Sequence, residues 1–283
     1  MNFKISKQIN KIIVLILCYS PVITAAQNLV KSGTVPDIFA QGIISTSAGE
    51  FAPTFTADEK TVYFTGGPTY IYYSKLVNQK WTTPVVASFS GQWKDMDPFL
   101  SPDGKRLFFS SYRPVSGTTP LQFAHIWYVE RLTGGEWSVP HHLNEPVNLD
   151  GINNYAPAVS SSGTLYFYSP NRNINHKSTY ASKWLGDHYG MSQLVAIVSE
   201  GGIHDPYIAP DERFLIFISS GSIYISFKMG DKWSERQSFG PEVNKGDKNS
   251  SPSLSPDRET LYYSSDKVDG ILKVSLYRLG LKK

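Results

Sequence analysis

Acids and amides recur in this sequence just before a repeated proline. We group them as the candidate rim, together with two ring-bearing neighbours: Glu50, Asp95, Asp97, Asn154, Tyr155, His204, Asp205 and Asn249. Carboxylates that crowd together raise one another's pKa and can act as a general acid or a cation site. Glycosidases place two carboxylates about 5–9.5 Å apart across the scissile bond. Glu50, Asp95, Asp97 and Asp205 are therefore the candidate catalytic residues if this protein is an enzyme.

The same side chains also have a structural interpretation, because Asp and Asn accept hydrogen bonds from backbone N–H groups wherever tight loops are built. The two interpretations predict different geometries. An enzyme needs two of the carboxylates inside a pocket, with at least one raised pKa. A binding module needs carboxylates that bind loop N–H groups on a flatter, open rim.

Other potentially reactive residues carry weaker signals. We expect four aspartates that follow the repeat prolines to form hairpin turns: Asp58, Asp103, Asp211 and Asp257. His141 and His142 are adjacent, so they point to opposite faces of a strand and do not predict a metal site. The sequence predicts no cofactor; the alternative is Ca²⁺ in a central channel, which requires several carboxylate and carbonyl oxygens to converge.

The elements that position these residues belong to an internal repeat. Its prolines are Pro53, Pro98, Pro157, Pro206 and Pro252, at spacings of 45, 59, 49 and 46 residues. After each proline come a turn and an aromatic, β-branched run such as Leu107-Phe108-Phe109, which is typical of a hairpin strand. A third strand follows, and a fourth begins near a tryptophan, with Tyr189 in that place in the third copy.

Four strands per unit and five units predict an all-β fold: a single five-bladed β-propeller of four-stranded antiparallel blades. The last copy ends after its third strand, whereas one apolar segment, residues 42–45, precedes the first copy. We therefore expect this N-terminal segment to be the outer strand of the last blade and to close the ring.

The segment from Asp95 to Ser111, with its Pro-x-Leu-Ser-Pro-Asp-Gly-Lys pattern, resembles the TolB-type propeller repeat, a Pro-Asp (WD40-like) relative of the WD repeat. The resemblance covers nearly all of residues 40–279, although Pro-Asp is replaced by Ser161-Ser162 in the third copy. It implies a periplasmic or exported scaffold that usually binds proteins. A propeller hosts many activities, so the resemblance predicts fold more specifically than function.

The first 26 residues predict a secretory signal. Lys4, Lys7 and Lys11 precede a short apolar run, and Ala25-Ala26 offers a small-residue cleavage site. We expect residues 1–26 to be removed and residues 27–283 to form the propeller, either periplasmic or secreted. Removal leaves 24 basic and 24 acidic residues, since the whole chain has 27 and 24. This balance disfavours nucleic-acid partners, and no insertion into a membrane is expected after cleavage.

On these grounds the expected function is a monomeric, non-catalytic binding module that recognises a protein or a glycan at the candidate rim. The alternative is a carbohydrate-active enzyme that uses a pair of the rim carboxylates. Two loops, residues 112–123 and 171–177, are expected on the same rim and are candidates for contacting a partner.

Overall fold

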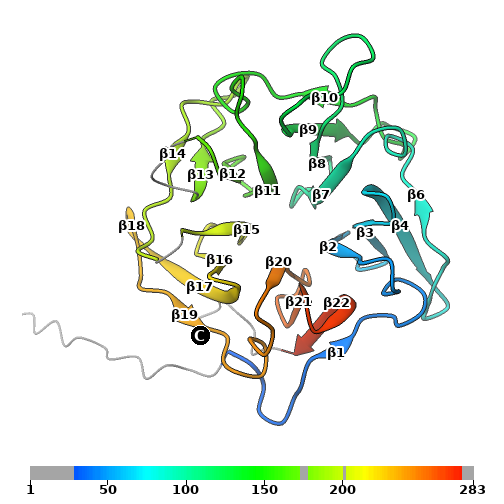
Figure 1. Ribbon diagram of the computed structural model, residues 1–283, viewed down its shortest axis with the longest axis vertical. Coiled ribbons are helices and arrows are strands. Elements are labelled where there is room, and N and C mark those ends of the chain that lie inside the picture. Colours follow the sequence, from blue (N-terminus) through cyan, green and yellow to red (C-terminus); the bar gives the residue numbers. More distant parts are fainter. Residues whose placement is uncertain (1–28, 173–177, 200–201, 276–283) are drawn as a thin grey trace, which may run out of the picture.

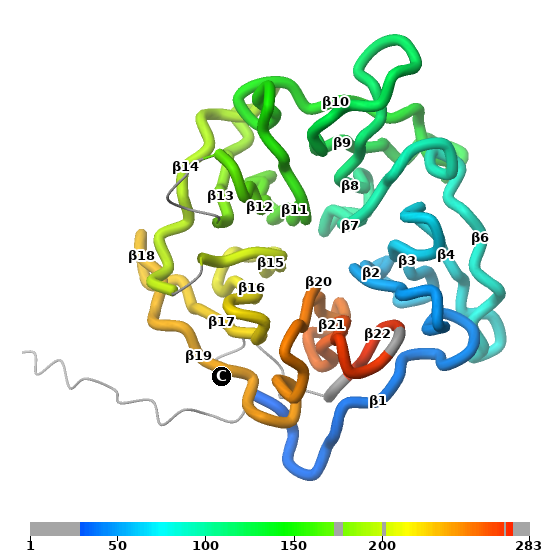
Figure 2. Tube along the Cα trace, in the orientation of Figure 1, coloured from blue at the N-terminus to red at the C-terminus, as the bar shows by residue number. Residues whose placement is uncertain are grey.

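Strands account for all the regular secondary structure in the computed structural model, which describes residues 29–172, 178–199 and 202–275. Five antiparallel sheets surround a central axis (Figures 1 and 2), as the repeats predict. Their innermost strands are β2 (Phe51–Phe55), β7 (Asp95–Leu100), β11 (Tyr155–Val159), β15 (His204–Ile208) and β20 (Asn249–Leu254). The chain is therefore a five-bladed β-propeller.

Each innermost strand leads into a second and a third strand. The second strands are β3 (Thr61–Gly66), β8 (Arg106–Ser111), β12 (Leu165–Ser169), β16 (Phe214–Ser219) and β21 (Thr260–Ser265). The third strands are β4 (Tyr70–Val77), β9 (His125–Glu130), β13 (Ser178–Ser182), β17 (Ser222–Met229) and β22 (Val268–Ser275). The second strands are the most buried; all six residues of β16 are inaccessible, because a neighbouring blade covers each face.

The outer edge of each blade is short and irregular. It consists of β5 (Lys80–Trp81) with β6 (Val85–Val86), β10 (His141–His142), β14 (Gln193–Leu194), and β18 (Lys232–Trp233) with β19 (Gln237–Ser238). In the first and fourth blades, the strand that contains the predicted tryptophan (β5 or β18) pairs with the end of the third strand and forms a small hairpin. The strand that follows it (β6 or β19) pairs with an earlier part of the same third strand and forms the outer edge of the blade. In the third blade Tyr189 takes this position and bridges to Trp184, as the repeat predicts.

The last blade obtains its outer strand from β1 (Asp37–Ile38), where Ile38 pairs with Leu272. The sequence placed this strand at residues 42–45, and that assignment is wrong. These residues fold back on themselves, because the Gly42 N–H donates to the Ser45 carbonyl at 2.8 Å and Ile44 N–H donates to Ala40. Ile44 is still buried, which explains the misleading apolar signal.

Apolar side chains pack between blades rather than within one blade. The five hydrophobic clusters each join two adjacent blades around the ring, including the last blade with the first. The described residues contain no helix long and apolar enough to cross a bilayer. The predicted signal, residues 1–26, lies outside the described residues.

Candidate functional site in the central channel

A strained backbone position recurs at the axis of the propeller. The residue before each repeat proline has a positive φ, between 47° and 55°, and the pairing of each inner strand shifts register there. These residues are Ala52, Asp97, Ala156, Asp205 and Ser251. A left-handed conformation costs a non-glycine residue about 1–2 kcal/mol. The resulting bulges turn these residues toward the axis, where all five line one channel.

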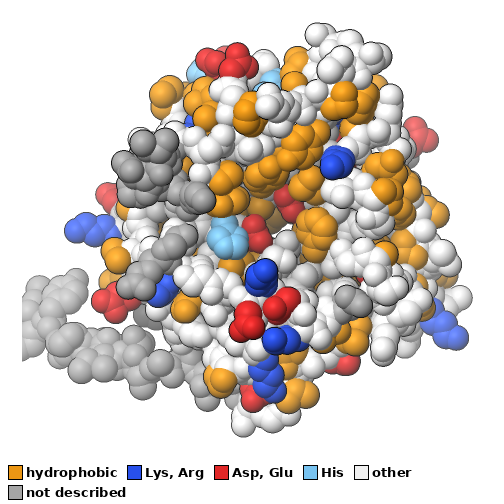
Figure 3. Space-filling view, viewed as in Figure 1, with side chains coloured by type: hydrophobic (Ala, Val, Ile, Leu, Met, Phe, Trp, Pro, Cys, Tyr) orange, Lys and Arg blue, Asp and Glu red, His pale blue; other side chains and the backbone are white. Residues whose placement is uncertain are grey.

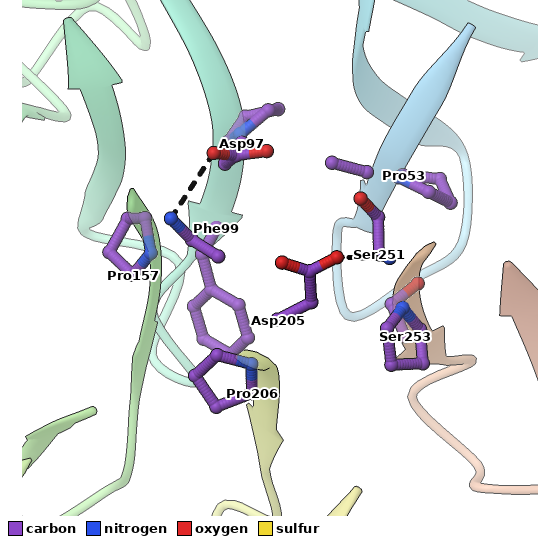
Figure 4. Close-up of a pocket in the computed structure, with 12 residues that line it drawn as sticks. Pro53, Asp97, Phe99, Pro157, Asp205, Pro206, Ser251 and Ser253 are labelled. Atoms are coloured by element: carbon purple, nitrogen blue, oxygen red, sulfur yellow. Dashed lines mark hydrogen bonds between the residues drawn. The ribbon is translucent and has the colours of Figure 1, made fainter. Parts of the chain in front are cut away.

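Asp97 of the second blade and Asp205 of the fourth blade bring their carboxylates into this channel (Figure 4). Asp97 accepts the Ala156 N–H at 3.1 Å and the Ser110 hydroxyl at 3.3 Å. Asp205 accepts the Ser251 N–H at 3.0 Å, and its other oxygen is 3.5 Å from Nδ1 of His204. Each carboxylate thus binds a backbone N–H of the following blade.

Burial raises the pKa of Asp97 to about 7, and the negative charge of Asp205 adds to this effect. The hydrogen bonds from Ala156 and Ser110 oppose the rise without cancelling it. A carboxyl group with this pKa is partly protonated at neutral pH, which is what a general acid requires.

The channel is narrow. Its free volume is about 30 Å³, and its lining includes the repeat prolines and Phe99. The Phe99 ring points into the channel in Figure 4, packs 6.0 Å from the Tyr207 ring and contacts three of the interblade clusters. This volume holds only about one or two water molecules, so a larger molecule would have to bind above it.

Aromatic side chains form an arc at the mouth of the channel. The hydroxyls of Tyr112 and Tyr155 are 2.8 Å apart, and the Tyr155 ring lies 6.5 Å from that of Tyr168. Tyr168 in turn lies 5.4 Å from the His204 ring. Burial, followed by the bond with Tyr112, raises the pKa of Tyr155, so its hydroxyl stays protonated. In Figure 3 histidine and acidic side chains lie at the central hollow, with hydrophobic side chains gathered along one side.

Four other members of the candidate rim are not in the channel. Glu50, Asp95, Asn154 and Asn249 stand three residues before the proline, and all four are buried within the blades. This placement corrects the predicted rim, which treated the positions one and three residues before the proline as equivalent. The bulge turns only the residue next to the proline toward the axis.

The buried members of this group act as hydrogen-bond partners. Asp95 forms a 2.8 Å ion pair with buried Arg113 and accepts the Ser90 and Ser111 hydroxyls. Glu50 accepts the Thr46 N–H at 2.8 Å. The Glu50 contact matches the structural interpretation, whereas Asp95 is held by side-chain donors and not by loop N–H groups.

The remaining amides of the rim are tied to neighbouring loops. Asn154 donates to Asn148 at 3.2 Å, and Asn249 donates to Asn244 at 3.1 Å. Neither side chain is accessible to a ligand, so only Tyr155, His204, Asp97 and Asp205 of the candidate rim reach the channel or its mouth.

The repeat aspartates are turn formers, as predicted. Asp58, Asp103 and Asp257 each accept the N–H of the residue two positions later, at 2.9–3.1 Å. Asp211 does the same for Arg213 at 3.3 Å.

The structure also pairs two histidines that the sequence did not connect. Nδ1 of His125 is 2.9 Å from Nε2 of His142, because β9 and β10 pair across a long loop. Burial, followed by repulsion from His142, lowers the pKa of His125 to about 4. His141 points the other way and stacks on Tyr128. Within the described residues, no three His, Cys, Asp or Glu side chains form a metal cluster.

No model of a known protein family matches the sequence, and no curated protein matches it either. The fold does match solved structures. A gluconolactonase from Xanthomonas campestris gives a TM-score of 0.53 at 12% identity, over 89% of this chain and 93% of that chain. A thermostable family-43 glycoside hydrolase gives 0.56 at 13% identity, over 87% and 94%. A glucose dehydrogenase gives 0.50 at 13% identity, over 85% and 99%.

At these identities the likeness establishes the β-propeller fold, and the TolB-type family is not confirmed. The three structures named here are enzymes. This finding corrects the expectation of a non-catalytic binding module, because the same architecture supports catalysis in each of them.

Proposed function

We propose that the protein is a carbohydrate-active enzyme, a hydrolase whose active site is the mouth of the central channel. The observation that carries this proposal is the pair Asp97 and Asp205, two carboxylates from different blades in one channel, with the pKa of Asp97 raised to about 7. The names of the three similar structures, which concern gluconolactone, glycosides and glucose, support a sugar as substrate.

The two carboxyl groups have different environments, which fits the division of labour in glycoside hydrolysis. Asp97 is the proposed general acid: in its protonated form, which is partly populated at neutral pH, it donates its proton to the leaving oxygen of the glycosidic bond. Asp205 is the proposed base or nucleophile, oriented by the Ser251 N–H and adjacent to His204.

The substrate would bind above the carboxylates, because the channel itself is too small for a sugar ring. The arc of Tyr155, Tyr168 and His204 offers flat faces for the ring and polar edges for its hydroxyls. Only the bond to be cleaved would then approach Asp97 and Asp205.

The cellular context is part of the same proposal. The predicted signal at residues 1–26 and the resemblance of the repeats to TolB-type repeats support an exported, monomeric enzyme that acts on a glycan in the periplasm or outside the cell.

The direct test is an assay of residues 27–283 against aryl glycosides and sugar lactones, with Asp97→Asn and Asp205→Asn as variants. General acid–base catalysis typically contributes about 10²–10⁴-fold, so each variant is expected to lose at least about 100-fold in kcat/KM. Asp103→Asn is the matched control, because Asp103 lies in a turn at the opposite end of β7. Hydrolysis of no substrate, or equal activity in all four proteins, would contradict the proposal.

A further inference from the structure

A second hollow lies between the second and third blades, at the opposite end of the inner strands from the channel mouth. The hairpin turns of β7–β8 and β11–β12 line it, and its volume is about 520 Å³. An adjoining hollow of about 610 Å³ lies toward the fourth blade. Both volumes fall in the range of small-ligand sites, about 300–1,000 Å³. Trp184 lines both hollows, so its side chain stands between them.

Trp184 departs from the pattern of the other blades. Ser182 of β13 corresponds to Ser74 of β4 and Ser226 of β17, because each hydroxyl donates to a carbonyl of the residue eight positions later. Two residues further on, the first blade has Leu76 and the fourth has Lys228. Only the third of these blades places an aromatic ring there.

The ring of Trp184 is held in place from several sides. It packs edge-on against Tyr189 at 5.0 Å, and the Arg106 guanidinium of the second blade lies 5.5 Å from the ring centre. Gly163 approaches so closely that a Cβ there would lie 2.9 Å from the Trp184 Cβ. Half-buried and fixed, the ring is a preorganised platform rather than a mobile surface side chain.

The turn of the third repeat, which has lost Pro-Asp, lies beside this platform. The turn carries Ser161 and Ser162 instead, and Glu212 of the fourth blade accepts the hydroxyls of Ser160 and Ser162 at 2.7 and 2.6 Å. Glu212 thereby takes the place of the missing aspartate. Ser161 remains exposed on the wall shared by the two hollows.

Polar groups around the platform are balanced in charge. Arg106 pairs with Glu130 at 3.0 Å, and Arg131 donates to the Gly135 carbonyl while stacking on Trp137. The first hollow is lined by three basic and two acidic side chains: Lys105, Arg106, Arg131, Asp103 and Glu130. The second hollow is lined by one basic and two acidic side chains: Lys183, Asp211 and Glu212. A site for phosphate would concentrate basic donors instead.

From this combination we infer that the interblade hollow at Trp184 binds a neutral oligosaccharide. An apolar face of a sugar ring would stack on Trp184, while its hydroxyls bond to Ser161 and to the Arg106–Glu130 pair. The two hollows would accept consecutive sugar units on either side of the ring. This binding site is separate from the channel and does not depend on the activity proposed there.

Titration calorimetry with cellohexaose, xylohexaose and maltohexaose tests this inference on residues 27–283. At least one hexasaccharide should bind with a Kd below about 1 mM. Trp184→Leu, which introduces the residue found at Leu76 in the first blade, should weaken binding at least tenfold while the protein stays folded. Lys228→Leu is the matched control at the same register of the fourth blade and should bind normally.

Asp97→Asn separates this site from the channel, since it removes the proposed general acid at the other end of the inner strands. Binding unchanged in Asp97→Asn and lost in Trp184→Leu supports the inference, whatever the result of the hydrolysis assay. Absence of binding at about 10 mM, equal binding by Trp184→Leu, or loss of binding in Asp97→Asn would overturn it.

Discussion

The position of an acid relative to the repeat proline decides its environment in this protein. Asp97 and Asp205 directly precede a proline and reach the channel, whereas Asp95, two residues earlier than Asp97, is fully buried against Arg113. The bulge before each proline produces this difference, because it turns one residue of the strand toward the axis. Strain of this kind is commonly found at functional sites.

The raised pKa of Asp97 predicts an unusual dependence of stability on pH. With a folded-state pKa of about 7, above the ordinary value of 3.8, the folded protein holds this proton more tightly than the unfolded chain. The contribution of Asp97 to stability is complete below about pH 4 and is lost as the pH rises to about 7.

The Asp97→Asn variant cannot ionise at this position. Its free energy of unfolding should therefore increase relative to that of the wild type as the pH rises. Each pKa unit corresponds to about 1.4 kcal/mol, and the gain between pH 5 and pH 8 should be roughly 2–3 kcal/mol. Urea unfolding of both proteins at the two pH values measures it. A difference that does not change with pH would show that Asp97 titrates near its ordinary value.

At the scale of the element, the third blade has lost its turn aspartate, and a glutamate of the fourth blade makes the missing hydrogen bond. In three other blades a Ser or Thr hydroxyl donates to the aspartate of its own turn, as Ser101 does to Asp103 at 2.6 Å. The third blade has no such aspartate, and Glu212 of the next blade accepts from Ser160 instead. A contact within one turn has become a contact between blades.

Glu212 is therefore expected to contribute to stability. Burial alone would raise its pKa, but hydrogen bonds from Ser162 and Ser160 outweigh burial and lower it, so its contribution is present above about pH 4.5 and is lost in acid. Glu212→Ala should cost about 1–3 kcal/mol at pH 7, because it leaves several hydroxyls without their acceptor.

The matched control for Glu212 is Glu242→Ala, which removes an exposed ion pair with Lys245. Such pairs contribute only about 0–1 kcal/mol. Thermal unfolding of the three proteins at pH 7 compares the effects, and equal losses in both variants would refute the role assigned to Glu212.

The whole molecule is held together by contacts between blades. Each hydrophobic cluster spans two neighbours, and the segment before the first blade completes the cluster between the last blade and the first. Phe39 occupies the centre of this junction, with its ring 5.8, 5.5 and 5.1 Å from those of Phe55, Trp81 and Tyr262. Its N–H also donates to the Ile271 carbonyl.

Phe39→Ala should therefore destabilise the whole ring. Truncation of a buried phenylalanine costs about 3–5 kcal/mol, and here the loss falls at the junction between the first and the last blade. Val35→Ala, two residues before β1 and 65% exposed, should change the free energy of unfolding by less than about 0.5 kcal/mol. Denaturant unfolding distinguishes them, and a similar small effect in both would show that the ring does not need Phe39.

The repeat itself was readable from the sequence, because alternating aromatic and β-branched runs between Pro-Asp turns specify strands locally. Five such units cannot bury their faces separately, so the propeller and the turn-forming role of Asp103 followed from residue types and spacing. The enzyme interpretation was available only as an alternative, because a repeat that specifies packing carries little information about function.

Tertiary structure decided which candidate residues meet. Bulges in the inner strands bring Asp97 and Asp205 into one channel and leave Glu50 buried. The spacing of each acid from the repeat proline differs in the sequence, but only the bulges show which spacing leads to the channel. The closing strand at Asp37–Ile38 and the His125–His142 pair likewise depend on loops whose paths are set by distant contacts. Local sequence determines strands and turns, whereas the environment and pKa of a side chain depend on what the rest of the chain places beside it.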